Sequence, residues 1–517
     1  MEFAFKHDLV LDTAYSTLPR ASRRELHART AAALEELTDE PEDIAPILAH
    51  HWREGGEAER SRQYLIAAAE RARQALAVED AYDLYSQALE LASTDADRVN
   101  MRWLRAHALI QLQDYARAAD ELEELIPLLH GKSQVEALVA QSHAMLWTEQ
   151  TEETMASARR AFELAGEGGY QELETEAIGM VAAAHGMCGE SGDLEKAVAL
   201  GDEALARWTP GTRRAEHAEI YHLASNHLYW YGEYQRAMDA SVLSFTAAGV
   251  DLHSQEFRLR GAGMQAVILA GMGRYGEALA AADHAIALGR DMGRPVSVAV
   301  NYSTLPLREI FALEDALVRS EEVAENLGPS TFNMPWMNAR ADVFVARVMR
   351  GDLSDADRGW SELWEDAVTS RAWERWLVSG RLAAARAELD LALGRVDDAQ
   401  TWAQRAIDMA VTSSRSKYEA IGRTMLGRTL LAAGLADDAA MELRHAQAVA
   451  ETNGAPFIRW QAQAALGEAL AASGVDPSGA FHEATSIIGT IAEVLPPPRA
   501  AVFLDDPHVS QVLDAAR

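Results

Sequence analysis

Apolar residues recur along this chain with the spacing of amphipathic helices, and a short turn interrupts them about every forty residues. The turn is a glycine with a few polar residues, and the helix that follows carries alanine in its first turn. Clear copies begin at Gly192, Gly232, Gly273, Gly351, Gly394 and Gly434, and a degenerate copy lies at 313–316. Successive clear copies are 40, 41, 78, 43 and 40 residues apart, and the degenerate copy divides the gap of 78. This period indicates helix pairs that cannot bury their apolar faces alone and must stack on one another.

The repeat predicts an all-α fold, namely a right-handed superhelical solenoid of about ten tetratricopeptide-like helix pairs. Ala, Leu, Glu and Arg dominate the composition and only 15 of the 517 residues are proline, which favours helix nearly throughout. A single globular core stops growing at roughly 250–300 residues. A solenoid is free of that limit because each helix pair contacts only its neighbours.

Four zones follow from the pattern. Residues 1–40 differ from the repeats, residues 41–95 hold the first helical hairpins, and residues 96–495 form the repeat array. Residues 496–517 open with Pro496-Pro497-Pro498, which halts any helix, and continue with an apolar segment and a short final helix. We expect this last zone to be a C-terminal cap over the last exposed helix face.

Charge and cysteine content narrow the choice of partners. The formal net charge is −32, and no basic run is present, so we expect neither a direct nucleic-acid partner nor a membrane partner. Cys188 is the only cysteine, which excludes an intrachain disulfide and a thiolate metal cluster. No apolar stretch approaches ~18 residues and no secretory leader opens the chain, so the predicted location is cytoplasmic.

Several segments resemble a known class of proteins. The opening Phe5-Lys6-His7-Asp8-Leu9-Val10 and the later Arg24-Glu25-Leu26-His27 resemble the end of a winged helix. His50-His51-Trp52 and 67–72 resemble the first repeats of the same proteins, and 495–513 resembles their C-terminal end. Together they resemble the C-terminal part of large bacterial signalling ATPases of the STAND/AAA type, as found with class III adenylate cyclases and LuxR-type ATP-binding regulators.

This resemblance implies that residues 1–40 are the remnant of a winged-helix-like region. It also implies a missing upstream ATP-binding module, present in cis or in trans. The chain would then be the regulatory repeat portion of a signalling protein, without the ATPase domain.

Four motifs that suggest chemistry fit structural roles better. Gly271-Met272-Gly273-Arg274-Tyr275-Gly276 spells a dinucleotide fingerprint, but Gly273 is in register with the repeat turn at Gly232. Gly131-Lys132-Ser133 lacks the glycine of a phosphate loop five positions earlier, and His482-Glu483 lacks the second histidine of a zinc protease. His217, His222 and His227 are spaced by five, which rotates each by ~140° from the last on a helix. We therefore expect no cofactor, no metal and no enzymatic activity.

Tryptophans form a further candidate site. Trp360 and Trp364 lie one helical turn apart, and Trp373 and Trp376 open the next helix. They are suited either to packing between adjacent helices, which is the interpretation we favour, or to a stacking platform for a ligand.

The inner helix of each pair should line a concave groove. Counting back from Gly232 along that helix gives the candidate binding residues Glu219, His222, Asn226, Tyr229 and Trp230. The equivalent positions before Gly273 include Arg260 and Val267 and are mostly bland. A histidine, an amide and two aromatic rings suit a protein or peptide partner, or a small effector.

Three functions remain open at this stage. The leading hypothesis is a non-catalytic repeat domain that binds a protein or effector as sensor or scaffold of a signalling ATPase or cyclase-linked regulator. The second is a free-standing tetratricopeptide adaptor that mediates protein–protein interaction. The third, an enzyme with a site inside the helical array, is disfavoured by the motifs above.

Overall fold

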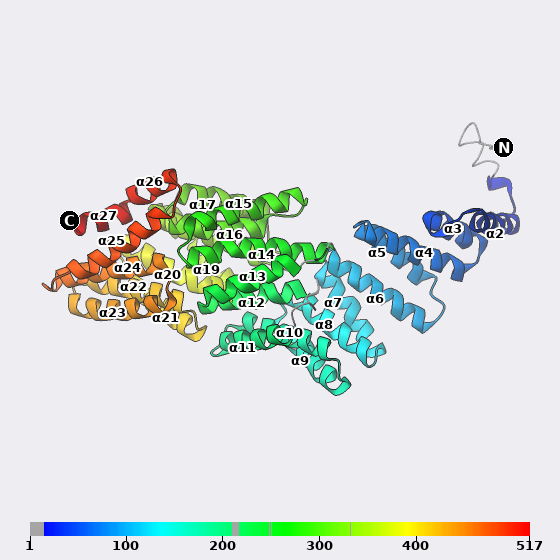
Figure 1. Ribbon diagram of the computed structural model, residues 1–517, viewed down its shortest axis with the longest axis horizontal. Coiled ribbons are helices and arrows are strands. Elements are labelled where there is room, and N and C mark those ends of the chain that lie inside the picture. Colours follow the sequence, from blue (N-terminus) through cyan, green and yellow to red (C-terminus); the bar gives the residue numbers. More distant parts are fainter. Residues whose placement is uncertain (1–14, 209–216, 248, 250, 331) are drawn as a thin grey trace. The chain divides into compact units, whose positions relative to one another are not determined.

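The computed structural model describes residues 15–208, 217–247, 249, 251–330 and 332–517, and these residues form helices and no strand (Figure 1). The chain divides into two compact units. Unit 1 is Met1–Ala144 with Asp251–His253, and unit 2 is Met145–Val250 with Ser254–Arg517. The all-α helical-repeat solenoid predicted from the sequence is therefore present.

Unit 1 is a series of helices, and from α2 to α7 each α-helix packs against the next. Its core includes Leu48, Tyr85 and Met101, all fully buried. The Phe5–Val10 part of the winged-helix resemblance lies outside the described residues. The helices are α2 (Arg20–Leu37), η1 (Pro41–Ile44), α3 (Ala45–Gly55), α4 (Ala58–Gln74), α5 (Val78–Glu90), α6 (Asp95–Gln111), α7 (Tyr115–Leu125), η2 (Ile126–Leu128) and most of α8 (Lys132–Leu146).

Unit 2 contains the longer series of helix pairs. Most even-numbered helices pack both on the helix that follows and on the next even-numbered helix, so they form the inner layer. These inner helices are α10 (Gln171–Cys188), α12 (Ala218–Tyr231), α14 (Leu252–Gly271), α16 (Ser297–Glu309), α18 (Met334–Arg350), α20 (Ser379–Ala392), α22 (Ser416–Ala432) and α24 (Pro456–Ala472). The outer helices are α9 (Thr151–Gly168), α11 (Asp193–Arg207), α13 (Tyr234–Ala247), α15 (Tyr275–Asp291), α17 (Leu313–Asn326), α19 (Leu353–Thr369), α21 (Val396–Thr412), α23 (Ala436–Asn453) and α25 (Ser478–Glu493).

The repeated turn has one backbone geometry. All six repeat glycines have φ between +74° and +101°, the left-handed region that a residue without Cβ adopts at little cost. At the degenerate copy Phe311 takes this position with φ +56°, and Gln113 does so in unit 1 with φ +62°. The alanine in the next helical turn is buried in every clear copy, as at Ala237 and Ala399. A small side chain there lets the two helices of a pair approach closely.

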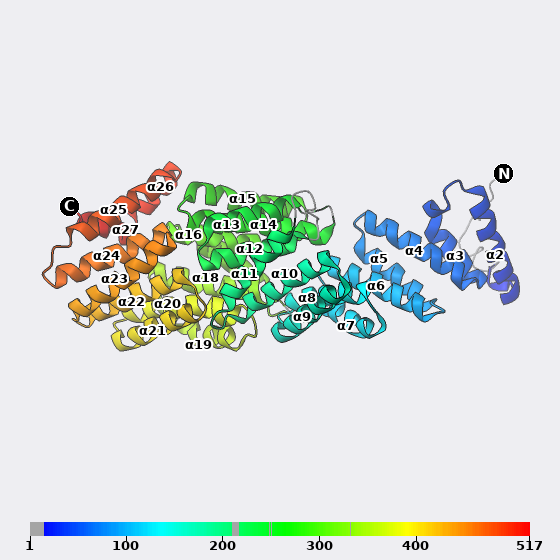
Figure 2. The ribbon, with the colours of Figure 1, turned by 60° about the horizontal axis from the view of Figure 1, so that its bottom comes forward.

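Segments of unit 2 that are far apart in sequence come into contact. Tyr234, the first residue of α13, donates a hydrogen bond of 2.7 Å to Asn453, the last residue of α23, ten α-helices further along the chain. The indole of Trp376 reaches the backbone of Met187 in the same way. Figure 2 shows α10 and α11 beside the α18–α20 region. The superhelix in unit 2 thus closes on itself, so its inner helices enclose a buried interior.

The chain ends in two short helices, α26 (Pro497–Asp505) and α27 (Pro507–Ala515). Phe503 and Val509 are fully buried in an apolar cluster with Phe311 and Ile488. Both helices pack on α25, where the sequence predicts a cap.

Candidate functional site

The inner helices of unit 2 surround a cavity of about 160 Å³. Its wall is built from α12, α14, α16 and α18, from the π-helical turn η4 (Glu374–Val378), and from the starts of α20 and α22. The cavity therefore exists because the superhelix closes, and residues from 147 to 418 meet in it.

Four of the five candidate residues predicted from the sequence line this cavity: His222, Asn226, Tyr229 and Trp230. The fifth, Glu219, is buried one helical turn away and accepts a hydrogen bond of 2.7 Å from Nε1 of Trp147, which itself lines the cavity. The structure brings these side chains together, while their role in binding stays a prediction.

Aromatic rings form much of the cavity wall. Besides Tyr229 and Trp230, the lining includes Trp147, Tyr302, Phe332, Trp373 and Tyr418. The guanidinium of Arg260 lies 4.1 Å from the ring centre of Trp147, and its Nε donates to Glu256 at 2.9 Å. Such a wall offers large flat apolar surfaces for stacking.

Burial keeps the imidazole of the cavity wall neutral. Burial, with a smaller contribution from Arg260, lowers the pKa of His222 to about 3. Asn226 donates to the backbone oxygen of His222 at 2.9 Å. At neutral pH His222 is therefore an uncharged polar group, and the charge of the cavity comes from other residues.

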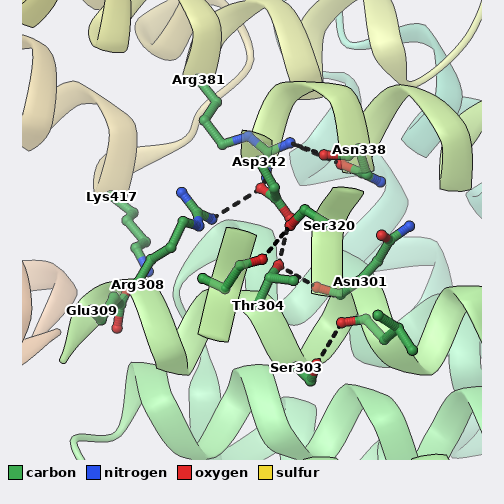
Figure 3. A network of polar contacts seen from close by, with 12 residues as sticks. Asn301, Ser303, Thr304, Arg308, Glu309, Ser320, Asn338, Asp342, Arg381 and Lys417 are labelled. Atoms are coloured by element: carbon green, nitrogen blue, oxygen red, sulfur yellow. Dashed lines mark hydrogen bonds and ion pairs between the residues drawn. The ribbon is translucent and has the colours of Figure 1, made fainter. Parts of the chain in front are cut away.

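A buried carboxylate, Asp342 of α18, is at the centre of a polar network (Figure 3). It pairs with Arg308 at 3.2 Å and with Arg381 at 2.8 Å. Thr304 donates its hydroxyl to the same carboxylate, and Arg381 also donates to the side-chain oxygen of Asn338 at 3.1 Å. One carboxylate thus serves two guanidinium groups.

Arg415 is a third buried guanidinium in the wall, only 5% exposed. It donates to the backbone oxygen of Leu377 at 3.1 Å and lies 4.0 Å from the ring centre of Tyr418. Within the described residues no carboxylate lies within 4 Å of it. Burial lowers the pKa of Arg415, as expected for a cation removed from water.

A second cavity of about 190 Å³ lies next to the first and shares Leu305, Arg308, Arg381 and Tyr418 with it. Lys417 borders this second cavity and pairs with Glu309 at 2.6 Å. Figure 3 shows this pair beside the network around Asp342. The positive charge of Lys417 is therefore already compensated by Glu309.

Three of the four misleading motifs lie in ordinary helices and turns of the repeat array or of unit 1. Gly271 ends α14, Gly273 adopts φ +78° in the turn, and Gly276 lies in α15, so the fingerprint is a repeat turn as predicted. Lys132 opens α8 after a 3₁₀ turn rather than a strand. His482 and Glu483 lie on α25, with Ser486 one helical turn from His482, as the sequence shows.

The histidines and tryptophans named from the sequence pack internally. The ring of His217 stacks on Trp208 with centroids 3.8 Å apart, while His222 and His227 are buried separately on α12. Trp360 and Trp364 stack at 5.3 Å and meet Trp402 edge-on, in the packing arrangement that the sequence favours. Of the four tryptophans, Trp373 lines the cavity.

One group in unit 1 has the chemistry of a metal site. His27, His50 and His51 have ligand nitrogens that lie within 4.8 Å of one another. Imidazole suits zinc, copper and nickel. However, the Nδ1 atoms of His27 and His51 face each other at 2.8 Å and share a hydrogen bond, so two of the three histidines are already paired with each other. Sequence reasoning missed this group, although the adjacent His50-His51 pair was a visible signal.

Sequence reasoning also missed the charged half of the cavity. Arg308, Asp342, Arg381 and Arg415 lie on or directly before later inner helices, where the same backward count from each repeat turn would have reached some of them. Arg415 precedes α22 and enters the cavity only because the superhelix closes. Arg260 and Val267, which the sequence ranks as bland, line the cavity as well.

One comparison with known proteins, a likeness to a solved structure, supports the fold. No protein-family model and no curated protein sequence matches the chain. The structure is similar to that of the Rap protein complexed with Competence and Sporulation Factor, with a TM-score of 0.51 and 11% identity over 69% of this chain and 99% of that chain. It is also similar to the APC/C hetero-tetramer Cut9–Hcn1, with a TM-score of 0.48 and 14% identity over 99% of this chain and 94% of that chain. The first likeness shows the fold, a tetratricopeptide-like helical-repeat solenoid. Within the described residues, no helix is long and apolar enough to cross a bilayer.

Proposed function

We propose that this chain is a non-catalytic, cytoplasmic repeat protein whose inner-helix cavity binds a peptide or small effector. The observation that carries the proposal is the cavity itself, where aromatic rings, amides and guanidinium groups from seven helical segments converge. Concave sites with an apolar wall and a few placed polar groups are typical of ligand binding. The Rap protein, whose fold is similar, was solved in complex with Competence and Sporulation Factor, which agrees with a binding role for this architecture.

Closure of the superhelix suggests how binding would be transmitted. A ligand in the cavity would contact α12 and α22 at once, and these inner helices belong to segments joined by the Tyr234–Asn453 hydrogen bond. A ligand that fits the closed arrangement better than an open one shifts the population toward closure. The position of distant repeats relative to one another would then depend on whether the ligand is bound.

The partner context is part of the proposal. We propose that the chain acts as the sensor or scaffold of a bacterial signalling ATPase, on the strength of the sequence resemblance. The alternative is a free-standing adaptor protein. The DNA directly upstream of the first codon tests this: an in-frame nucleotide-binding motif supports the ATPase context, and an unrelated gene supports the adaptor.

Binding in the cavity can be tested with a filled-cavity variant. Val298 lies in the first turn of α16 and lines the cavity, so Val298→Phe reduces the space available to a ligand. A panel of short synthetic peptides and common metabolites is screened by thermal midpoint and by quenching of intrinsic tryptophan fluorescence, since Trp147, Trp230 and Trp373 line the site. We expect a subset of probes to raise the midpoint of the wild-type chain and to lose this effect in the variant.

The matched control is Val242→Phe on α13, where Val242 is 43% exposed and outside the cavity. This variant should bind the same probes as the wild type. The proposal is wrong if no probe binds, or if binding persists unchanged when the cavity is filled.

A further inference from the structure

The cavity carries a surplus of positive charge inside a strongly acidic protein. Among the described residues, four guanidinium groups and one carboxylate line it, whereas the whole chain has a net charge of −32. The charge of Arg260 is compensated by Glu256 behind the wall, at 2.9 Å. Asp342 compensates one of the two charges of Arg308 and Arg381, and Arg415 has no acidic partner within 4 Å in the part of the chain that the structure describes. Two positive charges therefore remain uncompensated by these residues.

These remaining cations are buried, which makes them costly. Arg308 is 6% exposed and Arg415 is 5% exposed. An unpaired ion in a protein interior is penalised by several kcal/mol, and proteins normally pair such ions or let them bind an oppositely charged group. The Nε atoms of Arg308, Arg381 and Arg415 are buried and have no hydrogen-bond partner among the residues that the structure describes.

The electrostatic field of these groups is visible at a neighbouring side chain. Burial alone would raise the pKa of Tyr418, but Arg415 and Arg381, with Lys417 and Arg308, lower it below its usual value. The hydroxyl of Tyr418 therefore lies in a region that favours negative charge. Tyr418 belongs to the wall of both cavities, so this region is part of the site rather than of the outer surface.

We infer that the ligand of this cavity carries a carboxylate, which Arg415 binds together with Arg308 and Arg381. This inference rests on the proposed function and specifies its ligand. The planar guanidinium fork matches a carboxylate, and Arg308 and Arg381 already pair with one, each through a single terminal nitrogen that reaches Oδ1 of Asp342. The rest of the ligand is apolar or aromatic, because it faces Trp230, Tyr302 and Trp373.

Amide groups suit a ligand with peptide bonds. Asn301 donates to the backbone oxygen of Pro335 at 2.7 Å, while its buried Oδ1 accepts no hydrogen bond from the described residues. Asn226 and Asn338 also line the cavity. The carboxylate is either the C-terminus of a short peptide or the acid group of a small organic acid, and both present the same group to Arg415.

Matched pairs of probes test the inference on the wild-type chain. One pair is an N-acetylated dipeptide that ends in phenylalanine, as the free acid and as the C-terminal amide. The second pair is phenylacetate and phenylacetamide, and inorganic phosphate serves as a separate anion. Calorimetric titration at constant ionic strength should show that each acid binds about 10- to 100-fold more tightly than its amide, as expected for hydrogen bonds to a charged group. Preference for the dipeptide acid over phenylacetate identifies a peptide, and the reverse identifies a small organic acid.

Two variants locate the effect. Arg415→Gln should abolish the preference for acid over amide, whereas Arg444→Gln, at an exposed arginine on α23, should keep it. A purely structural role of Arg415 would lower the thermal midpoint of the Arg415→Gln variant and leave the preference intact, which overturns the inference. If Arg415→Gln fails to fold, Arg381→Gln replaces it.

The outcomes separate this inference from the proposed function. Equal binding of acid and amide, still blocked by Val298→Phe, overturns the carboxylate and leaves the cavity as the binding site. Phosphate binding without any carboxylate binding also overturns it. Absence of binding by every probe contradicts both proposals.

Discussion

The indole Nε1 of Trp376 donates a hydrogen bond of 3.1 Å to the backbone oxygen of Met187, across 189 positions of sequence. The ring lies directly over Gly189, where the Cβ of any other residue would overlap the indole Cδ1. Arg375 reinforces this contact by donating to the backbone oxygen of Cys188 at 2.8 Å. The end of α10 and the turn η4 therefore form one of the contacts that close the superhelix of unit 2.

Removal of the indole should open this contact. We expect Trp376→Ala to destabilise unit 2 by about 3–5 kcal/mol, because a large buried ring is lost and a space remains. Trp376→Phe keeps most of the packing and loses the hydrogen bond, which costs about 0.5–1.5 kcal/mol. Urea unfolding followed by circular dichroism measures both. Equal effects of the two substitutions would show that the ring does not pack at this contact.

Alanine substitutions at two glycines distinguish the cost of a left-handed backbone from the cost of disturbing the contact that closes the superhelix. Gly189 and Gly351 have φ of +66° and +88°, but only at Gly189 would an added methyl group meet neighbouring atoms within 4 Å. Gly351→Ala should cost about 1–2 kcal/mol, the penalty of a left-handed residue with Cβ. Gly189→Ala adds a steric conflict with Trp376 and should lower the thermal midpoint clearly further. Similar midpoints for the two variants would contradict the close approach of the ring.

The repeat architecture is predictable because it depends on local rules. A residue with positive φ, most often glycine, follows the inner helices, and a small residue such as Ala237 follows the turn, so both leave a trace in the sequence. The same register places His222, Asn226 and Trp230 on the inner helix without knowledge of the fold. Helix existence and the inner-face residues of one repeat therefore follow from spacing alone.

Closure of the superhelix could not be predicted in this way. It depends on contacts such as Trp376 with Met187 and Tyr234 with Asn453, which join helices from repeats far apart in the chain. Small rotations between successive helix pairs accumulate along the superhelix and determine where the last helix pair lies. The sequence of a single repeat turn does not reveal this accumulated rotation. Arg415 reaches the cavity only because these rotations bring α22 back toward α12, which explains why this residue is absent from the sequence-based prediction. Arg308, Asp342 and Arg381 lie on other inner helices, to which the backward count from Gly232 and Gly273 does not extend.

The carboxylate of Asp342 should contribute strongly to stability. Asp342→Asn leaves Arg308 and Arg381 buried without an anion, and loss of one partner of a buried ion pair costs about 3–5 kcal/mol. Asp352→Asn is the control, since the pair of Asp352 with Arg350 is half-exposed and contributes about 1 kcal/mol at most. Urea unfolding at pH 7 compares the two. Comparable losses would mean that water or other groups compensate the two arginines.

A second carboxylate, Glu149, should make the stability of unit 2 depend on pH. It accepts a hydrogen bond of 2.8 Å from the backbone N–H of Asn333. Burial, followed by the charge and hydrogen bond of the neighbouring Glu374, raises the pKa of Glu149 far above its usual range. A carboxyl group with a raised folded-state pKa holds its proton more tightly in the folded chain than in the unfolded chain. The stabilisation that Glu149 gives to unit 2 is fully present below its unfolded-state pKa of about 4.3. It is lost as the pH rises from there toward the folded-state pKa.

Replacement of this carboxyl by an amide removes the titration and keeps the acceptor for Asn333. We expect Glu149→Gln to raise the thermal midpoint, by more at pH 8 than at pH 5.5, because the cost of keeping Glu149 protonated grows over that interval. Glu167→Gln, at an exposed glutamate near the end of α9, should shift the midpoint little and equally at both values. A gain from Glu149→Gln that is larger at pH 5.5 would mean that the folded chain lowers the pKa of Glu149, contrary to the effect of burial and of Glu374.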